Sequence, residues 1–381
     1  MEARDLFDDD EFLLQLWEAY RDARKNKRSA LATIAFDQHV EHNIHQLYRE
    51  IIEGRYQLSP SICFVVDKPV KREIFAADFR DRVVHHYVIN RLLRVFENQF
   101  IYDSYSCRKG KGTLFGIKRL QHAMRACTEN YTKEAYVLKM DLSGFFMSIN
   151  RQLLCDRVCD MVGRKYHEAD LERLLGLIRI IVMHDPTTNC CVRGGRGRWE
   201  GLPANKSLFK SQPGCGIPIG NLTSQIFANF YLSDFDRYVK ETLKMRYYGR
   251  YVDDFYIVHR DKQVLKHLVP KIRDYLACTV HVKLHPHKVY LQPCDKGIAY
   301  LGAEIHPWAI YPTRRVFANY ENMIGRMSAS DLAFMHSDAQ ERLTYSVNSY
   351  TGMCHHYDIY QYVRQTECLY PTEYLQMFPM L

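Results

Sequence analysis

Apolar residues recur along this chain at two spacings, and the change between them separates predicted helices from predicted strands. Spacings of three and four residues predict helices, whereas alternation or a short apolar run predicts a strand. Helices are expected over residues 1–57, 78–96, 151–183, 216–238, 261–276, 316–327 and 330–344. Strands are expected over residues 62–66, 135–142, 247–259 and 278–291. A long irregular segment is expected over residues 186–216.

The stretch from Tyr247 to His259 predicts a β-hairpin with an acidic tip. Aromatic and β-branched residues on both sides favour strands, and the adjacent Asp253 and Asp254 favour a turn. Two adjacent carboxylates repel each other unless a cation or another partner lies between them. An isolated Asp-Asp turn is usually only a solvated turn, so a metal site needs a further carboxylate.

Asp141 provides that carboxylate. It ends the apolar run over residues 135–140, and a glycine and two aromatic residues follow at positions 144–146. This order predicts a carboxylate at the mouth of a buried strand. Asp141 and Asp253 can share metal ions only if the fold brings their strands together.

The two acidic segments resemble the palm of a reverse transcriptase, in which such strands lie side by side and hold two Mg²⁺ ions. The matching motifs run from about Lys71 to Gly302. The resemblance implies an α+β fold of the right-hand polymerase type, with an antiparallel palm sheet packed on helices. It divides the chain into an N-terminal helical extension, fingers, a palm with a fingers-side insertion, and a helical thumb: residues 1–57, 58–134, 135–310 (insertion about 150–215) and 311–381.

The resemblance also implies the chemistry, which is attack of a primer 3′-OH on the α-phosphate of a dNTP. Asp141 and Asp253 would bridge two Mg²⁺ ions, for which Mn²⁺ could substitute, and the Leu142 carbonyl would help to hold one of them. Asp254 would contact one ion or tune the site. Phe146, five residues after Asp141, would pack where a ribose 2′-OH would lie and so select dNTPs.

Basic positions upstream match the fingers motifs of bacterial reverse transcriptases. Arg72 is a predicted phosphate-binding cation, although pairing with a nearby carboxylate explains it equally well. Residues 103–113 form a basic, glycine-containing loop, in which Arg108 and Lys109 are predicted to contact the incoming nucleotide. Basic loops with glycines are common, so this loop alone is weak support.

Residues 216–225 are the most diagnostic stretch. Ile219 and Gly220 stand where most bacterial reverse transcriptases have Gln-Gly, and Gln225 stands where they have proline. This form resembles the reverse transcriptases of diversity-generating retroelements, which copy a template RNA and misincorporate at its adenines. A glutamine at position 219 could hydrogen-bond the new base pair, but losing that contact costs only about 1 kcal/mol, a several-fold loss of discrimination. Other residues or a partner must therefore contribute.

Two later positions complete the predicted site. Lys288 matches the sixth family motif and Gly302 the primer-grip turn, so both are predicted to contact primer or template. The implied partners are template RNA, cDNA, dNTPs and a small basic oligomeric accessory protein. His281, His285 and His287 fit neither one helix face nor one strand face well, so no metal site is expected there.

Composition agrees with a globular nucleic-acid-binding protein. Hydrophobic residues make up 47%, charged residues 25%, and the net charge is +8. The stretch from Ser104 to Lys133 contains seven Lys or Arg and one Glu. Such a basic stretch suits binding to a phosphate backbone, although a solvent-exposed protein face can have the same composition. No stretch approaches eighteen consecutive apolar residues, the N-terminus is acidic, and the twelve cysteines form no CxxC pair. We therefore expect a cytoplasmic protein with reduced thiols and no membrane contact. The resemblance implies a bacterial, archaeal or phage origin.

Other functions stay open. An accurate group II intron-like or retron-like reverse transcriptase would use the same carboxylates; the sequence at Ile219-Gly220 disfavours both types, and the lack of a recognisable maturase region disfavours the first. A defence-associated polymerase that makes untemplated DNA is a further alternative. An RNA-binding scaffold without turnover is disfavoured because all three acidic positions are present.

Overall fold

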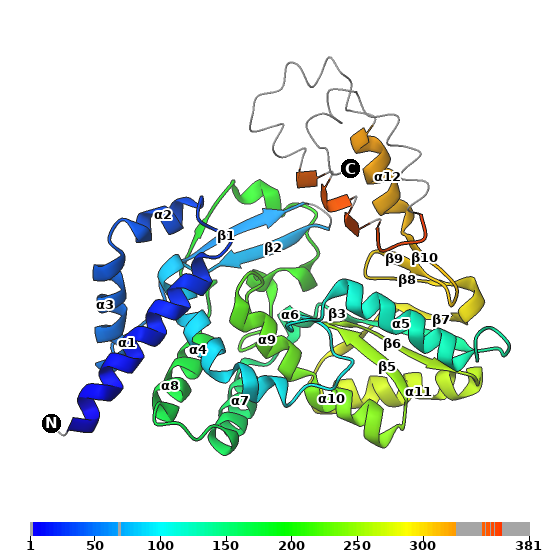
Figure 1. Cartoon of the computed structure of the whole chain (residues 1–381), viewed down its shortest axis with the longest axis horizontal. Helices are drawn as coiled ribbons and strands as arrows, with labels where there is room; N and C mark the ends of the chain where they lie inside the picture. The colour runs from blue at the N-terminus through cyan, green and yellow to red at the C-terminus, as the bar shows by residue number, and fades with distance from the viewer. Residues whose placement is uncertain are drawn as a thin grey trace, which may run out of the picture.

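A computed structural model of the chain describes residues 3–67, 70–324, 345–346, 348–350, 352–353 and 355–359. Helices surround a four-stranded antiparallel sheet, and two three-stranded sheets lie beside it (Figure 1). The predicted α+β class is therefore confirmed. The predicted helix over residues 330–344 and most of the predicted thumb lie outside the described residues, and the domain boundaries stay a prediction.

The N-terminal helices form one layer against α4 (Figure 1). They are α1 (Ala3–Arg24), α2 (Leu31–Asp37) and α3 (Val40–Ile52), and α4 spans Phe79–Glu97. Phe12 of α1 packs on Tyr48 and Tyr87 with ring centroids 5.4 and 5.1 Å apart. The Asp78 side chain caps α4 by accepting a hydrogen bond from the Arg80 N–H at 3.0 Å. The predicted helices over residues 1–57 and 78–96 are confirmed.

A small sheet in the predicted fingers region combines one predicted strand, β1, with two that were not predicted. Its order is β2-β1-β4, with β1 (Ser61–Val66) antiparallel to β2 (Arg72–Ala76) and parallel to β4 (Cys190–Val192). The segment over residues 186–216 is therefore not wholly irregular. After β4 it continues as three short 3₁₀ turns, at Arg196–Trp199, Ala204–Lys206 and Leu208–Lys210.

A buried carboxylate fastens this segment to the small sheet. Glu73 of β2 has no exposed surface. It accepts hydrogen bonds from the Trp199 indole, from the Ser207 hydroxyl at 2.8 Å and from the Leu208 N–H. Three donors on one carboxylate offset the cost of burying its charge.

The central sheet has the strand order β5-β6-β3-β7, and every neighbouring pair is antiparallel. The strands are β3 (Tyr136–Ser143), β5 (Tyr247–Tyr251), β6 (Asp254–His259) and β7 (Lys283–Pro293). One face buries Leu138, Met140 and Ile257 in the main core, whereas Val137 and Val258 pack with α5 in a second core. Successive residues of β3 thus enter opposite cores, which agrees with the prediction of a buried strand from the apolar run over residues 135–140.

Helices cover both faces of the central sheet (Figure 1). They are α5 (Thr113–Cys127) on one face and α11 (Lys262–Tyr275) on the other. The further helices of this part of the chain are α6 (Phe145–Ser148), α7 (Arg151–Lys165), α8 (Leu171–Met183), α9 (Leu222–Tyr231) and α10 (Ser233–Arg237). The prediction of a strand from residue 278 is partly wrong. Residues Leu276–Val280 extend α11 as a π-helical turn, because Leu276 and Val280 bury their side chains in the main core.

A third sheet and α12 follow the central sheet. Its order is β10-β9-β8, with β8 (Ile298–Tyr300), β9 (Ala303–Ile305) and β10 (Ile310–Pro312); α12 spans Arg314–Ile324. Leu301 and Gly302 join β8 to β9 with φ of 51° and 89°, the left-handed pair that a tight hairpin turn needs. The predicted turn at Gly302 is confirmed, whereas β10 was not predicted. No helix within the described ranges is long and apolar enough to cross a bilayer.

We predict that Glu73→Gln destabilises the protein by about 1–3 kcal/mol, because the amide places an N–H₂ donor against the donors that Glu73 binds. Chemical denaturation measures the change, and limited proteolysis should cleave faster within residues 196–210. The exposed Glu200 provides a control. Equal stability of Glu73→Gln and Glu200→Gln would contradict the anchoring role.

Candidate active site at the turn between β5 and β6

The fold brings the predicted carboxylates together near one end of the two inner strands of the central sheet, β3 and β6. Asp141 of β3 pairs in register with Asp254 of β6. The Leu142 N–H donates to the Asp253 carbonyl at 3.2 Å. The pairing of β3 with β7 shifts register between Met140 and Leu142, so the ladder is irregular at Asp141 itself. Such irregularities often re-aim a side chain next to a functional site.

The turn that carries Asp253 has an unusual backbone. Only Val252 and Asp253 join β5 to β6, and Val252 adopts φ of +55°. A β-branched residue rarely occupies this left-handed region, because its side chain crowds the backbone. The surrounding structure must therefore hold the turn in place.

The buried Arg250 side chain stabilises this turn. Its side chain has no exposed surface, and its Nη1 donates to the Val252 carbonyl at 2.9 Å. Asp236 of α10, equally buried, receives two hydrogen bonds from the guanidinium, at 2.7 and 2.5 Å. The same guanidinium also donates to the side chain and the carbonyl of Asn229. All three guanidinium nitrogens therefore have partners, and the turn is tied to α9 and α10.

Burial and mutual repulsion disfavour the ionised forms of the carboxylates at the turn. Burial, reinforced by the Asp141 charge, raises the pKa of Asp253 to about 6, although Arg72 and Lys288 oppose the shift. Burial also raises the pKa of Asp254 to about 7, although Lys139 lies 3.2 Å from it. The site therefore favours additional positive charge.

Asp254 is engaged differently from the other two carboxylates. Its Oδ2 pairs with Lys139, whose Nζ also donates to the Ala299 carbonyl of β8 at 2.9 Å. Its Oδ1 is buried without a hydrogen-bond partner. Lys139 therefore links Asp254 to the β8–β9 hairpin. Asp141 is the partner of Lys288, with Nζ and Oδ2 3.1 Å apart.

These residues fit a divalent metal site that substrate completes. The described residues contain no group of three or more His, Cys, Asp or Glu side chains placed to hold a metal ion. With Asp254 paired to Lys139, two carboxylates remain, Asp141 and Asp253. Mg²⁺ is commonly bound by one or two carboxylates plus substrate phosphates, so this pair fits it, and the orphaned Asp254 oxygen adds a further acceptor. Within the same described ranges, His281, His285 and His287 belong to no such group.

The predicted nucleotide-side residues lie against the fingers sheet. Phe146 and Ile219 pack on one apolar cluster, which contains Phe75 and Met147. The Ile219 carbonyl accepts the Phe75 N–H at 2.9 Å. Gly220 has φ of +127°, and an added Cβ would lie 3.1 Å from the Phe75 carbonyl oxygen, so glycine suits this position.

The predicted basic residues are placed unequally. Arg108 donates to Glu97 and to the carbonyls of Ile101 and Ser104, at 2.8, 2.7 and 2.8 Å, so its guanidinium is used inside the protein. Lys109 and Arg72 are exposed, and Arg72 is close enough to Asp253 to lower its pKa. Nucleotide contact by all three residues stays a prediction.

The remaining predicted residue, Gln225, lies on α9. Its Oε1 accepts from the Cys107 thiol of the predicted nucleotide loop at 3.0 Å. All ten cysteines among the described residues are free.

The long segment after β4 also reaches the site. The Asn205 amide donates to the Ser143 hydroxyl at 3.2 Å, two residues beyond Asp141. Gly144, with φ of +56°, lies so close to this segment that an added Cβ would be 2.5 Å from the Asn205 carbonyl. Glycine is therefore required between Asp141 and Phe146.

Sequence reasoning missed the supporting residues Arg250, Asp236 and Lys139. A signal was present for the first and last, since each is a charged strand residue whose immediate sequence neighbours are uncharged. A buried charge needs a partner, so such a residue marks a specific contact. The sequence does not reveal which element supplies that partner.

Comparison with known proteins gives both sequence and structural relatives. The family described as reverse transcriptase (RNA-dependent DNA polymerase) matches residues 68–305. Protein YkfC of Escherichia coli (strain K12) is 22% identical over 290 residues, which cover 66% of this chain and 68% of YkfC.

Two telomerase structures share a low overall similarity with the chain. The apo telomerase from Candida tropicalis, truncated from the C-terminal domain, aligns with a TM-score of 0.48 and 12% identity over 72% of this chain and 60% of that one. Telomerase from Candida albicans, in complex with the TWJ fragment of telomeric RNA, aligns with a TM-score of 0.44 and 10% identity over 79% of this chain and 56% of that one. The chain thus spans less than two thirds of these telomerase chains.

We predict that Asp253→Asn stabilises the metal-free protein, increasingly so as pH rises from about 5 to about 8. A carboxyl with a raised folded pKa binds its proton more tightly in the native state, so its contribution is present at low pH and is lost as pH rises through the folded pKa near 6. The expected gain at the higher pH is about 1 kcal/mol or more. Urea titrations at both pH values measure it.

Asp274→Asn, at an exposed position of α11, provides the control and should show no such trend. Saturating Mg²⁺ should narrow the difference between the Asp253→Asn variant and the wild type, because the cation stabilises the ionised site. A difference in unfolding free energy between Asp253→Asn and the wild type that does not change with pH would contradict the raised pKa of Asp253.

We also predict that Arg250→Met costs about 3–5 kcal/mol of unfolding free energy, because it leaves Asp236 buried without its cation. Adding Asp236→Leu should recover part of that loss, so the double variant is destabilised by less than the sum of the single variants. Arg164→Met, in an exposed pair with Asp160, should cost about 1 kcal/mol or less. Additive effects at Arg250 and Asp236 would contradict the pairing.

Proposed function

Because the chain belongs to the reverse transcriptase (RNA-dependent DNA polymerase) family, we propose that it copies a template RNA into DNA from dNTPs. The family match over residues 68–305 includes the fingers strand β2, the central sheet and the β8–β9 hairpin. The observation that carries the proposal is the placement of Asp141 beside the β5–β6 turn with Asp253 at its tip. A polymerase needs such a carboxylate pair to receive metal-bound phosphates.

The metal would lower the pKa of the primer 3′-OH and neutralise the departing pyrophosphate. Asp141 and Asp253 would hold it, with Mg²⁺ favoured by their oxygen ligands. Before substrate binds, Lys288 partly neutralises Asp141 and Arg72 faces the charge of Asp253. Asp254, held by Lys139, would set the position of the β8–β9 hairpin against the site.

Sugar selection would come from the wall formed by Phe146 and Ile219. Both side chains pack on the same apolar cluster, so the wall cannot yield easily to a larger group. An aromatic ring there would collide with a ribose 2′-OH and accept a deoxyribose. This supports dNTPs as the substrates.

We further propose that the enzyme is error-prone at template adenines and serves a diversity-generating retroelement. Two features of Ile219 support this. Its side chain has no hydrogen-bonding atom, and its backbone carbonyl already accepts a hydrogen bond from the Phe75 N–H. Neither group is then available to check the geometry of a new base pair. The effect of one contact is small, so a small basic accessory protein and the template RNA would supply the remaining selectivity.

We predict that Asp253→Ala lowers primer extension on an RNA template by at least about 10²-fold, since it removes a carboxylate placed for the transition-state charge. Incorporation of labelled dNTPs at fixed Mg²⁺ measures the loss. Asp274→Ala, on the exposed face of α11, should retain wild-type activity. Full extension by Asp253→Ala, or no extension by the wild type under any divalent cation, would contradict the assignment.

We predict that Ile219→Gln reduces errors opposite template adenines several-fold, because the amide can hydrogen-bond the nucleotide or base pair. Sequencing of cDNA made from a defined RNA by purified protein measures the error spectrum, and Ile219→Leu controls for side-chain volume. Accurate cDNA from the wild type would indicate an accurate reverse transcriptase instead. DNA made without any template would indicate an untemplated polymerase.

A further inference from the structure

A small cavity behind α9 gathers unpartnered polar atoms. Among the described residues, eight buried side-chain nitrogen or oxygen atoms lack a hydrogen-bond partner. Four of them belong to residues that line this one cavity: both ring nitrogens of His85, Nε2 of His184 and Oγ1 of Thr223. His85 and Thr223 are only 3% and 1% exposed. A neutral imidazole has one donor and one acceptor, and leaving both unsatisfied in the interior is costly.

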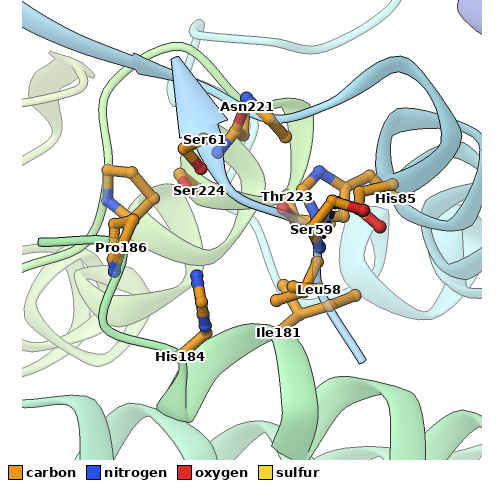
Figure 2. A pocket seen from close by; sticks show the side chains of 13 residues that line it. Leu58, Ser59, Ser61, His85, Ile181, His184, Pro186, Asn221, Thr223 and Ser224 are labelled. Carbon is orange, nitrogen blue, oxygen red and sulfur yellow. Dashed lines mark hydrogen bonds between the residues drawn. The ribbon is translucent and has the colours of Figure 1, made fainter. Parts of the chain in front are cut away.

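The cavity lies where four separate segments meet. Ser59 and Ser61 border it at the start of β1, His85 on α4, His184 just after α8, and Thr223 on α9. Figure 2 shows the His184 ring rising from the end of α8 toward the space bordered by these side chains. It leaves about 20 Å³ of room for the centre of a water molecule. About 10–15 Å³ accommodates one water, so a nucleotide or a hydrated metal ion is too large.

We propose that this cavity is a binding site for one ordered water molecule, which His85, His184 and Thr223 hold by hydrogen bonds. A water with three polar partners matches the usual coordination of internal waters. This proposal does not depend on the polymerase reaction or on the proposed function.

The chemistry of the lining favours a neutral occupant over an anion. Burial lowers the pKa of His85 to about 3 and also lowers that of His184, so both rings are neutral near pH 7. The Asp81 carboxyl also borders the cavity, where it accepts hydrogen bonds from the Tyr56 hydroxyl and the Ser59 N–H. The N-terminal end of α9 favours negative charge. The two neutral imidazoles and the Asp81 carboxyl beside it do not favour an anion.

The water would fix the first turn of α9. Thr223 lies in that turn, two residues before Gln225 and three after Gly220. A direct link from this region to the fingers sheet is the hydrogen bond from the Ala77 N–H to the Asn221 side chain, at 3.1 Å. Asn221 and Ala77 border the same cavity, so a water joining Thr223 to α4 and to the end of α8 would add a second link to this turn.

A crystal structure of the full chain at a resolution that shows ordered water tests the site directly. We expect one density peak within hydrogen-bonding distance of His85, His184 and Thr223. An empty cavity in well-defined density would overturn the proposal. A peak with anomalous scattering in bromide, or a melting temperature that depends on halide concentration at constant ionic strength, would overturn the neutral occupant.

A pair of matched variants provides the second test. Thr223→Val keeps the side-chain shape but removes the hydroxyl, so the water and the histidines lose a partner. The melting temperature should fall by about 1–3 °C, and the amides of the first turns of α9 should exchange hydrogen several-fold faster. Thr223→Ser keeps the hydroxyl and should retain the water.

Thr33 is the control, because it is a buried threonine in the first turn of α2 whose hydroxyl is also unpartnered but does not line this cavity. Thr33→Val should leave the melting temperature unchanged or raise it. If Thr223→Val behaves like Thr33→Val and its α9 amides exchange at the wild-type rate, the water does not hold this turn.

Discussion

The buried ion pair between Arg250 and Asp236 is the interaction on which the acidic site depends. Removing both charges from water is expensive, and the cost is offset only because every guanidinium nitrogen and both carboxylate oxygens have partners. One of those partners is the Val252 carbonyl, so the pair determines how the β5–β6 turn leaves the sheet. The strained φ of Val252 and the mutual repulsion of the carboxylates persist because this network leaves the turn no other arrangement.

The same logic explains why the three aspartates differ. Asp254 faces Lys139, which also binds the Ala299 carbonyl, so the third carboxylate connects the turn to the β8–β9 hairpin. Asp141 and Asp253 are left to share added positive charge, and burial raises the pKa of Asp253 in its absence. A site of this kind is poised for cations that arrive with substrate. Its geometry is provided by the sheet and by the buried pair beneath it.

Much of this arrangement could be predicted from the sequence. The hairpin around Asp253, the strand that ends near Asp141 and the capped helix α4 all follow local rules of periodicity and capping. The three-residue strand β4 could not be predicted, since it exists only because β1 offers it a parallel edge. The ion pairs of Arg250 and Arg108 also depend on tertiary contacts. Arg108 is predicted to contact the incoming nucleotide, and the sequence did not show that Glu97 and two carbonyls also bind its guanidinium.

The most direct test of the central claim is anomalous diffraction from crystals grown with Mn²⁺, an RNA template, a DNA primer and a dNTP that cannot be incorporated. We expect manganese peaks between Asp141 and Asp253, with separations of about 4 Å if two ions bind. The Lys288 ammonium should then have left Asp141, while Lys139 stays on Asp254 and the Arg250 contacts with Asp236 and Val252 are unchanged. Metal bound elsewhere, with Asp141 and Asp253 free of it, would contradict the account.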